Sequence, residues 1–254
     1  MVTSGTLFKA SLGVRRALFR PAVSVVQHPA IAAVGENTVV VKNARSTEGL
    51  IPIRSMGPAH TGRIASHLLA LGPHDRYLRF GYVANDEQVR RYVDGLNFER
   101  DEVFGIYNRR LQLIAMAHLS FSTNPQLKSC AEFGVSVLSY ARGRRYGARL
   151  FERAVIHARN NGVGMMFIHA LSENTVMLNI ARKAGATIER DGSESEAYLK
   201  LPPANLDSRV AEMLEEQIAQ TDYRLKVQAK QFWDWLGVIQ DVRQGVRDGR
   251  DRMK

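Results

Sequence analysis

The chain has 254 residues, of which 45% are hydrophobic and 24% are charged. This length and composition suit one sizeable globular domain with extensions, or two small domains, and they exclude a chain that is disordered throughout. The net charge of +10 favours anionic partners, a class that includes nucleic acid, membrane surfaces and phosphorylated cofactors. Cys130 is the only cysteine, so no internal disulfide can form, and because no Cys/His cluster has the spacing of a zinc site we expect no metal.

The first segment, residues 1–35, contains no Asp or Glu and carries four basic residues. Such a composition is compatible with a mitochondrial transit peptide, and the alternative is a poorly ordered basic extension. Arginines and Pro21 interrupt its apolar residues, and no run in the chain reaches the length of a transmembrane helix. We therefore expect a soluble protein in the cytoplasm, with the mitochondrion as the alternative, and no membrane partner.

Hydrophobic periodicity predicts a succession of strands and helices between residues 50 and 201. Gly72-Pro73 ends the first helix and Asn161-Gly162 ends a later one, because these residues terminate helical backbone. Residues 165–171 form a continuous apolar run, which is typical of a strand covered on both faces. The expected strands are 50–56, 103–107, 111–121, 130–139, 165–171 and 197–201, and the expected helices are 58–71, 86–96, 146–160 and 174–184.

Residues 135–151 carry a strand, a basic turn and the start of a helix in direct succession. The first turn of a helix leaves backbone N–H groups without partners, and together with the positive end of the helix dipole they form an anion site. Gly143 and Gly147 would let phosphates approach the backbone. The turn therefore predicts a site for a phosphate-bearing cofactor. Positive charge is added there by Arg142, Arg144, Arg145 and Arg149.

Pro202-Pro203 is the clearest domain boundary in the sequence. Beyond it, apolar residues at alternating spacings of four and three form a seam, weakened by two polar members, that suits one long helix packed on a partner helix or in a groove. The alternative is that this helix lies back on its own domain. We expect a basic extension at 1–35, a domain at 50–203, and a helical extension at 205–254 that is a candidate surface for homo-oligomerisation. The seam residues are Leu214, Ile218, Thr221, Leu225, Gln228, Phe232, Trp235, Ile239, Val242 and Val246.

Residues 50–201 resemble the GNAT superfamily of N-acetyltransferases, which transfer acetyl from acetyl-coenzyme A (acetyl-CoA) to amines. The resemblance rests on the strand Glu132–Val137, the turn Arg142–Gly147, and Ser172-Glu173-Asn174 after the next strand. It implies an α/β (α+β) fold with a mixed, mostly antiparallel central sheet flanked by helices. It also implies acetyl-CoA as acyl donor and an amine or protein lysine as acceptor. The short motif Arg76–Phe80 is similar to modules of bacterial protein-lysine acetyltransferases, which points to a protein lysine.

The resemblance further implies which residues bind acetyl-CoA. The backbone of Val137, Leu138 and Ser139 would pair with the pantetheine arm. Arg142 and Gly147 match the ends of the family's Arg/Gln-x-x-Gly-x-Gly/Ala turn, whereas Arg145 stands where the family usually has glycine. The implied pyrophosphate site comprises Arg142, Gly143, Arg144, Arg145, Tyr146, Gly147 and Ala148.

The helix after the fifth long strand carries one further match and one departure. Asn174 matches the family's asparagine that contacts the pantetheine or adenosine-side arm, and Asn is also a preferred N-cap residue, so both roles can coexist. Seven residues on, Ala181 stands where many members place a tyrosine that protonates the leaving thiolate. Because the conjugate acid of a thiolate has a pKa of about 8.5, solvent can serve as the acid instead.

Transfer to an amine needs a base that removes a proton from the ammonium group. Glu132 is the leading candidate, because a partly desolvated carboxylate on the cofactor strand can have its pKa raised toward neutrality. The alternatives are that Glu132 is exposed or paired with an arginine, and that His118 or His169 is the base. A second hypothesis for the chain is a non-catalytic acyl-CoA-binding regulatory or assembly module. Nucleic acid is not expected as a partner, because the basic residues lack interleaved aromatics.

Overall fold

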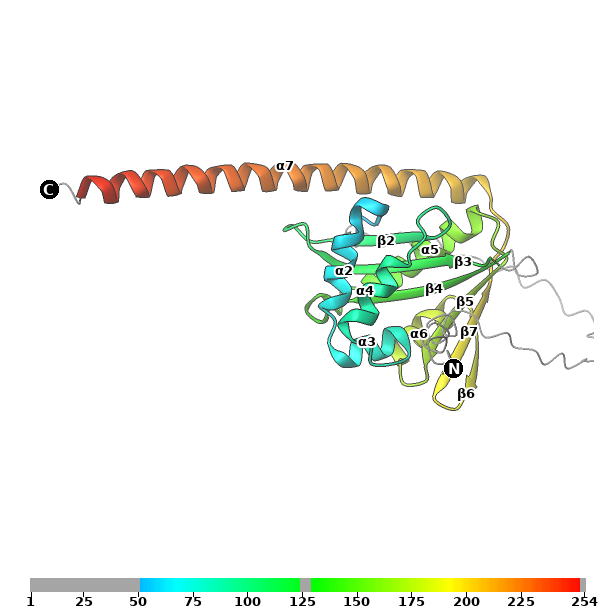
Figure 1. Ribbon diagram of the computed structural model, residues 1–254. Helices are drawn as coiled ribbons and strands as arrows, with labels where there is room; N and C mark the ends of the chain where they lie inside the picture. The colour runs from blue at the N-terminus through cyan, green and yellow to red at the C-terminus, as the bar shows by residue number, and fades with distance from the viewer. Residues whose placement is uncertain (1–50, 124–128, 252–254) are drawn as a thin grey trace, which may run out of the picture. The chain divides into compact units, whose positions relative to one another are not determined.

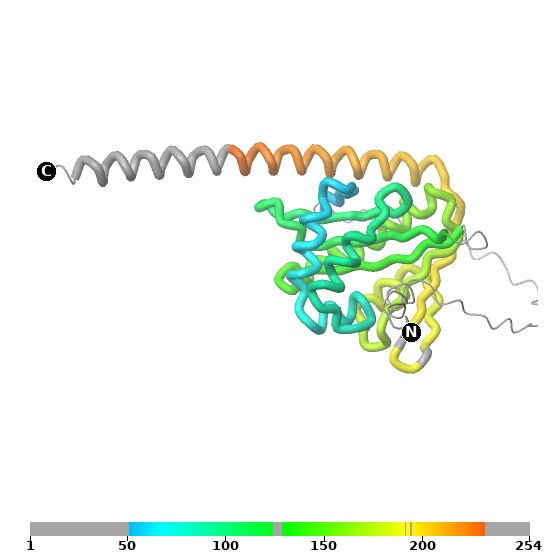
Figure 2. The backbone as a smooth tube through the Cα atoms, viewed as in Figure 1, coloured from blue at the N-terminus to red at the C-terminus, as the bar shows by residue number. Residues whose placement is uncertain are grey.

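The computed structural model describes residues 51–123 and 129–251, with side chains up to residue 231 apart from 191 and 194. The expected basic extension, residues 1–35, lies outside the described residues. Figure 1 labels the helices and strands, and Figure 2 traces the backbone in the same view. In chain order they are β1 (Arg54–Ser55), the short turn η1 (Pro58–His60), α2 (Thr61–Leu69), α3 (Pro73–Phe80), α4 (Asp86–Asp94), β2 (Glu102–Tyr107), β3 (Leu113–Phe121), β4 (Cys130–Val137), the short turn η3 (Ser139–Ala141), α5 (Tyr146–Asn160), β5 (Met165–Leu171), α6 (Thr175–Lys183), β6 (Thr187–Asp191), β7 (Glu194–Lys200) and α7 (Leu206–Asp251).

The described strands form one sheet in the order β1-β2-β3-β4-β5-β7-β6. Every neighbouring pair is antiparallel except β4 and β5, which are parallel. The expected mixed, mostly antiparallel sheet flanked by helices is therefore confirmed (Figure 1). Helix α5 and strand β5 have the predicted bounds, because a full amphipathic or apolar pattern is followed in each case by a clear end signal.

Two elements were not predicted. Gly72-Pro73 ends α2 as expected, but Pro73 also begins α3, since proline is well suited to the first turn of a helix. Gly81, in the left-handed region with φ 79°, closes that helix. Strand β6 pairs only with β7 at the edge of the sheet, and its charged residues, which are common on edge strands, hide the strand pattern.

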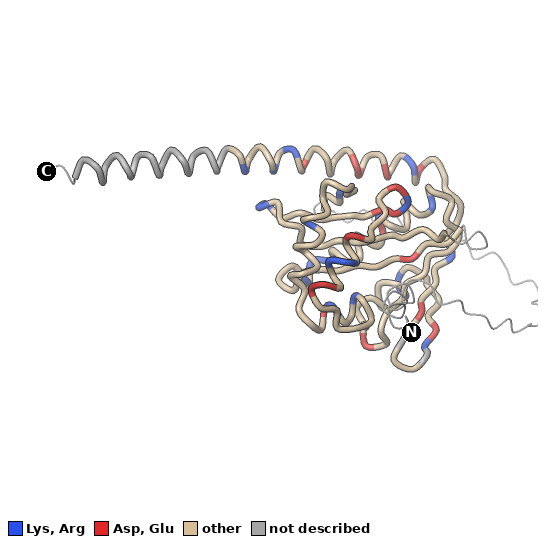
Figure 3. The backbone as a smooth tube through the Cα atoms, in the orientation of Figure 1, with Lys and Arg blue, Asp and Glu red and all other residues tan. Residues whose placement is uncertain are grey.

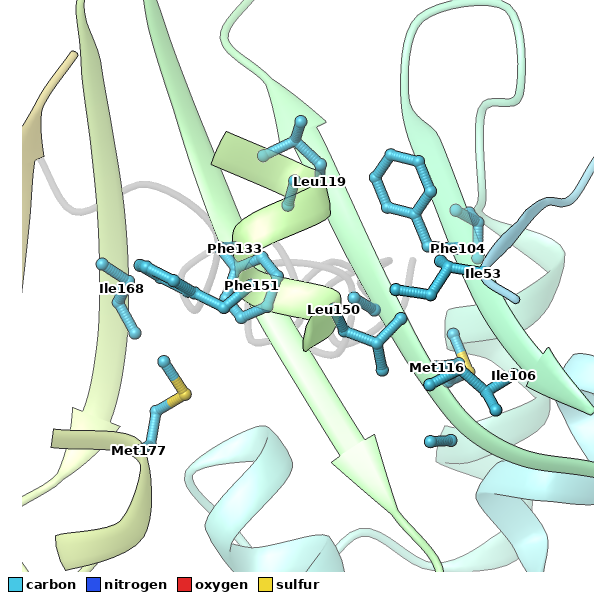
Figure 4. Close-up of a cluster of buried hydrophobic side chains, with 14 of the residues drawn as sticks. Ile53, Phe104, Ile106, Met116, Leu119, Phe133, Leu150, Phe151, Ile168 and Met177 are labelled. Atoms are coloured by element: carbon cyan, nitrogen blue, oxygen red, sulfur yellow. The ribbon is translucent and has the colours of Figure 1, made fainter. Parts of the chain in front are cut away.

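Helices cover both faces of the sheet, and alternate residues of β4 show which face is which. Phe133 meets Phe151 of α5 edge to face, with ring centroids 5.1 Å apart (Figure 4). Each phenylalanine buried in this core contributes roughly 1.5–3 kcal/mol. Ser136 points the other way, where its hydroxyl lies 2.8 Å from Nε2 of His67 on α2. Glu132, an even number of residues from Ser136, therefore lies on the face covered by α2 and α3.

Helix α7 begins by docking on its own domain through polar side chains. Arg153 of α5 is 3% exposed, and its Nη1 lies 2.7 Å from Glu212 Oε1. The Nδ1 atom of His157 lies 2.5 Å from the same oxygen. The predicted long helix is thus present, and its described first half lies back on the domain on a side away from the described seam residues, because Leu214 and Leu225 are 57% and 61% exposed. Among the described helices none is long and apolar enough to cross a membrane.

Candidate active site

The parallel strands β4 and β5 pair for a short distance and then part. Their last pair in register is Glu132 with Phe167, yet β4 continues to Val137 and β5 continues to Leu171. Backbone N–H and C=O groups on facing strand edges need partners, so the parted strands offer hydrogen bonds to an extended ligand. We call this feature the β4–β5 fork.

A hydrogen bond at the end of β4 shows which backbone groups face the fork. The N–H of Leu138 donates to the carbonyl of Ile114 beside β3, at 3.0 Å. Because backbone groups of successive residues alternate between the two neighbours, Val135 and Val137 direct theirs toward β5. The N–H of Leu138 is bonded on the β3 side, and its pairing with the pantetheine arm stays a prediction. Ser139 begins η3, past the end of the strand.

The turn between β4 and α5 contains two residues in the left-handed region. Gly143 has φ 76° and Arg145 has φ 60°. The left-handed region costs a residue with a Cβ atom roughly 1–2 kcal/mol, so the conformation fits the expectation that Arg145 occupies a glycine position. Arg145 is also the N-cap of α5 and provides no side-chain cap. The N–H groups of Gly147 and Ala148, in the first helical turn, can therefore bind an anion.

Positive charge surrounds this turn, and part of it is already neutralised. Arg142 forms an ion pair with Asp75 of α3, although its side chain remains 51% exposed. Arg149 pairs with Glu152 within α5 at 3.2 Å. Arg144 and Arg145 are exposed at the surface of the turn. The predicted residues from 142 to 148 thus lie together, with Tyr146, Gly147 and Ala148 half-buried in the first turn of α5.

Asn174 serves as the N-cap of α6. Its Oδ1 accepts a hydrogen bond from the N–H of Met177 at 3.2 Å. A capping role accounts for this residue without a cofactor, so contact with acetyl-CoA stays a prediction. Ala181 is fully buried on the same helix. The position where many family members have a proton-donating tyrosine is therefore occupied by a residue of the hydrophobic core.

Glu132 stands at the last β4–β5 pair and is half-buried. Burial raises the pKa of its carboxyl group above the ordinary range. The positive charges of His169 and Arg79 act in the opposite direction, and the negative charge of Glu196 adds to the rise. A carboxylate with a raised pKa accepts protons more readily, which suits a general base.

Arg79 of α3 covers β4 beside Glu132. A Cβ atom built on Gly134 would lie 2.7 Å from the Cζ atom of Arg79, so the guanidinium group can approach only because this residue is glycine. One guanidinium nitrogen, Nη2, donates to the hydroxyl of Tyr92 at 2.8 Å. The Nε atom is buried and has no hydrogen-bond partner within the described residues. A largely desolvated cation therefore lies next to the candidate base.

The polar chain continues from Tyr92 into the sheet. The Tyr92 hydroxyl lies 2.8 Å from Nδ1 of His118, and Nε2 of His118 lies 3.3 Å from Oδ2 of Asp101. The Tyr92 hydroxyl accepts from Arg79, so its own hydrogen is available to Nδ1 of His118, while Nε2 faces the Asp101 carboxylate without a hydrogen bond among the described residues. Burial lowers the pKa of His118, which is 7% exposed. This histidine is therefore enclosed, with Nδ1 already occupied by Tyr92, and both features argue against it as the base.

His169 is the more accessible of the two histidine alternatives. It lies on β5 two residues beyond Phe167, on the same face as Glu132. Its side chain is 44% exposed, and its Nδ1 lies 3.1 Å from Oε1 of Glu196 on β7. This pairing holds His169 beside Glu132, where its charge acts to lower the pKa of that carboxyl group.

Residues 74–186 match the model of the acetyltransferase (GNAT) family. The match includes the fork, Glu132 and the basic turn. The chain contains a GNAT acetyltransferase domain. This confirms the expected family and places acetyl transfer as the class of reaction.

Solved structures are similar to the GNAT domain. The GNAT domain of PAT from S. lividans has a TM-score of 0.51 at 18% identity, covering 59% of this chain and 89% of that chain. An acetyltransferase of the GNAT family from Streptococcus pneumoniae has a TM-score of 0.49 at 10% identity, covering 59% and 98%. At 18% identity, the S. lividans structure shows a common fold alone and does not transfer a substrate. No curated protein sequence matches this chain.

Sequence reasoning missed two residues of the GNAT domain's site, Arg79 and Gly134. A glycine within a strand often marks a close approach, and Arg79 lies in the Arg76–Phe80 motif, so both carried a signal. Arg76 in that motif is structural, because it donates to the carbonyls of Leu69, Leu71 and Ala84.

Within the described residues no cluster of three His, Cys, Asp or Glu side chains could hold a metal ion.

Proposed function

We propose that the GNAT domain transfers an acetyl group from acetyl-CoA to an amine by direct attack in a ternary complex, with Glu132 as the general base. The observation that carries this proposal is the position of Glu132. It lies where β4 and β5 part, and burial raises its pKa. A proton acceptor therefore stands beside the strand edges that would hold the donor.

The residues present fit acetyl-CoA at two separate points. The backbone groups of Val135 and Val137 face the fork, where the amide groups of a pantetheine arm could pair with them as an added strand would. The first turn of α5 offers N–H groups to a pyrophosphate, and a Cβ atom on Gly143 would meet nothing within 4 Å, so the turn is open. Bound acetyl-CoA supplies the acetyl group as a thioester.

The proposed step transfers two protons. Glu132 first takes a proton from the ammonium form of the acceptor, which frees the lone pair on nitrogen. The nitrogen attacks the carbonyl carbon, a C–N bond forms, and the C–S bond breaks with its electron pair on sulfur. The second proton leaves the new amide nitrogen and reaches the thiolate through solvent, because Ala181 provides no acid. An N–H of Val135 or Val137 is the candidate donor to the carbonyl oxygen.

The acceptor class that we propose is an amine, either a small molecule or a protein lysine. Lysine ammonium groups have a pKa of about 10.4, so a base is needed near neutral pH. The half-buried carboxylate of Glu132 would also attract the ammonium group to the fork before it accepts the proton. The need for a base and the attraction of the ammonium group do not depend on the rest of the acceptor. A panel of amines is therefore needed to identify the acceptor.

Thiol release from acetyl-CoA, measured with a panel of amines and lysine peptides, tests this function. With an active acceptor, Glu132→Gln should lower kcat roughly 10²–10⁴-fold while leaving the affinity for CoA unchanged. Glu99→Gln, at an exposed glutamate outside the site, is the matched control and should keep wild-type kcat. Full activity of Glu132→Gln together with loss in His169→Asn would reassign the base. Tight CoA binding with no thiol release from any acceptor would favour the non-catalytic module.

A further inference from the structure

The ion pair between Arg142 and Asp75 joins the basic turn to helix α3. Arg142 follows η3 at the start of the turn, Asp75 lies in the first turn of α3, and Nη2 of the arginine contacts Oδ1 of the aspartate. Basic and acidic segments are interspersed over the domain, so an ion pair alone does not mark a functional residue (Figure 3). This pair is unequal, however, because the side chain of Asp75 is 15% exposed and that of Arg142 is 51% exposed. One member is held within the fold, and the other extends toward solvent.

Asp75 lies on the side of α3 that faces the sheet. Residues four apart on a helix lie on the same side, so Asp75 shares its side with Arg79. The guanidinium group of Arg79 lies against Gly134 of β4, which shows that this side faces the strand. A negative charge in the first turn of a helix is also stabilised by the helix dipole. The carboxylate of Asp75 therefore has a favourable and partly enclosed position.

Helix α3 is itself anchored at several points. Arg76 donates to three backbone carbonyls, two before the helix and one after it. Nη2 of Arg79 donates to the hydroxyl of Tyr92 on α4, and the helix lies on β4 and β5. Because a shift of α3 would disturb these contacts, the carboxylate of Asp75 is a fixed hydrogen-bond acceptor.

Arg142 has the opposite character. A long, exposed arginine side chain samples many rotamers, and a ligand that needs it in one rotamer must offset that loss of freedom. Contact with a fixed carboxylate restricts these rotamers before any ligand arrives. A guanidinium group carries five N–H donors, and Asp75 contacts one of its nitrogens, Nη2, so donors remain for the oxygens of a phosphate. The ion pair therefore leaves Arg142 both oriented and able to bind an anion.

We propose that Asp75 is a positioning residue for the cofactor: its carboxylate orients Arg142 toward the pyrophosphate of acetyl-CoA. This rests on the proposed function, which puts the pyrophosphate at the basic turn. Asp75 acts through Arg142 and does not contact the cofactor. Its negative charge leaves the turn basic, because Arg144 and Arg145 are exposed there as well.

The sign of one substitution separates this role from its opposite. By Coulomb's law alone, Asp75→Asn should strengthen the binding of an anion, because it removes a negative charge beside the turn. Loss of positioning should instead weaken binding, roughly three- to tenfold, since the cofactor must then order Arg142 itself. Orientation of Arg142 and competition for Arg142 therefore predict opposite changes in the dissociation constant of CoA.

Calorimetric titration of the full chain with CoA tests the proposal without requiring turnover. Kd should rise roughly three- to tenfold in Asp75→Asn. It should also rise in Arg142→Gln, and adding Asp75→Asn to Arg142→Gln should cause no further change, because the carboxylate acts only through that arginine. Asp86→Asn, which removes the partner of Arg76 in another ion pair of α3, is the matched control and should keep the wild-type Kd.

Thiol release from S-acetylpantetheine, which has the thioester but no pyrophosphate, shows where the effect arises. With an acceptor that is active in the wild type, Asp75→Asn should lower kcat/KM for acetyl-CoA and leave kcat/KM for S-acetylpantetheine unchanged. An unchanged or lower Kd for CoA in Asp75→Asn would overturn the proposal, and so would an equal loss of affinity with and without Arg142. The expected changes in Kd without thiol release to any acceptor would support the positioning role and contradict the proposed function.

Discussion

The guanidinium group of Arg79 lies directly on the backbone of Gly134, where a Cβ atom would come within 2.7 Å of its Cζ. The contact joins α3 to the strand that carries Glu132, two residues away. It also fixes a positive charge that acts to lower the pKa of Glu132. Gly134 therefore affects the charge around Glu132, because glycine is the residue that lets the guanidinium group of Arg79 lie this close to the strand.

Gly134→Ala should displace Arg79 and strain its hydrogen bond to Tyr92. With the cation moved away, the pKa of Glu132 should rise further, so the acid limb of the kcat–pH profile should move to higher pH. We expect destabilisation of about 1–3 kcal/mol, measured by urea unfolding. Gly62→Ala on α2, where a Cβ atom meets nothing within 4 Å, is the control and should leave both measurements unchanged or slightly raise stability. An unshifted kcat–pH profile in Gly134→Ala would show that Arg79 does not influence the pKa of Glu132.

Glu132→Gln should stabilise the fold at neutral pH although it lowers activity. The folded-state pKa of Glu132 is raised, so the folded state binds more protons than the unfolded state between the two pKa values. Stability from this group is present at low pH and declines as the pH rises through that interval. A neutral glutamine removes the decline, so Tm of the variant should exceed that of the wild type at pH 8 and match it more closely at pH 4. A Tm below wild type at pH 8 would contradict the raised pKa.

Arg145→Gly should relieve backbone strain in the basic turn. Glycine adopts the left-handed region freely, so the variant should gain up to about 1 kcal/mol of stability in urea unfolding. Arg145→Asn tolerates the same backbone and also removes the charge, so the two variants should share any loss of CoA affinity in calorimetry. Unchanged affinity in both would mean that Arg145 makes no phosphate contact. Arg144→Gly, beside it at negative φ, should show no gain in stability.

Arg153→Met should loosen the docking of α7. Arg153 is 3% exposed between α5 and α7, and its loss leaves Glu212 and Glu216 without their main cation. Hydrogen exchange in residues 206–226 should rise at least tenfold, while Arg209→Met, on the exposed side of α7, should leave it unchanged. Protection retained in Arg153→Met would show that Ala219 and Tyr223 suffice for docking.

Acid should loosen the same contact. Burial acts to raise the pKa of Glu212, but hydrogen bonds from His157, Asn160 and Arg153 outweigh it and hold the value at about 2, against 4.5 for a free glutamate. A depressed carboxyl pKa contributes stability above pH 4.5, and this contribution is lost as the pH falls toward 2. Exchange in residues 206–226 should therefore rise between pH 4.5 and 2, and Glu212→Gln should remove most of that pH dependence.

The elements recovered from sequence are those whose signals are local. Helix α5 and strand β5 have the predicted bounds, because periodicity and end signals within each segment specify them. Helix α3 was missed because Gly72-Pro73 both ends one helix and begins the next, and β6 because it is an edge strand defined by pairing. Arginines and glycines close together in the chain mark the basic turn, and Arg145, at a position where the family usually has glycine, adopts left-handed backbone.

The sequence by itself determined helix α5, strand β5, the basic turn before α5 and the heptad spacing beyond Pro203. Each depends on residues close together in the chain, whose spacing sets their local conformation. Only the tertiary structure decided that Leu138 bonds toward β3, that Arg79 lies on Gly134, and that α7 docks by its polar face. These depend on pairing register and on contacts between segments far apart in the chain, which no local spacing specifies.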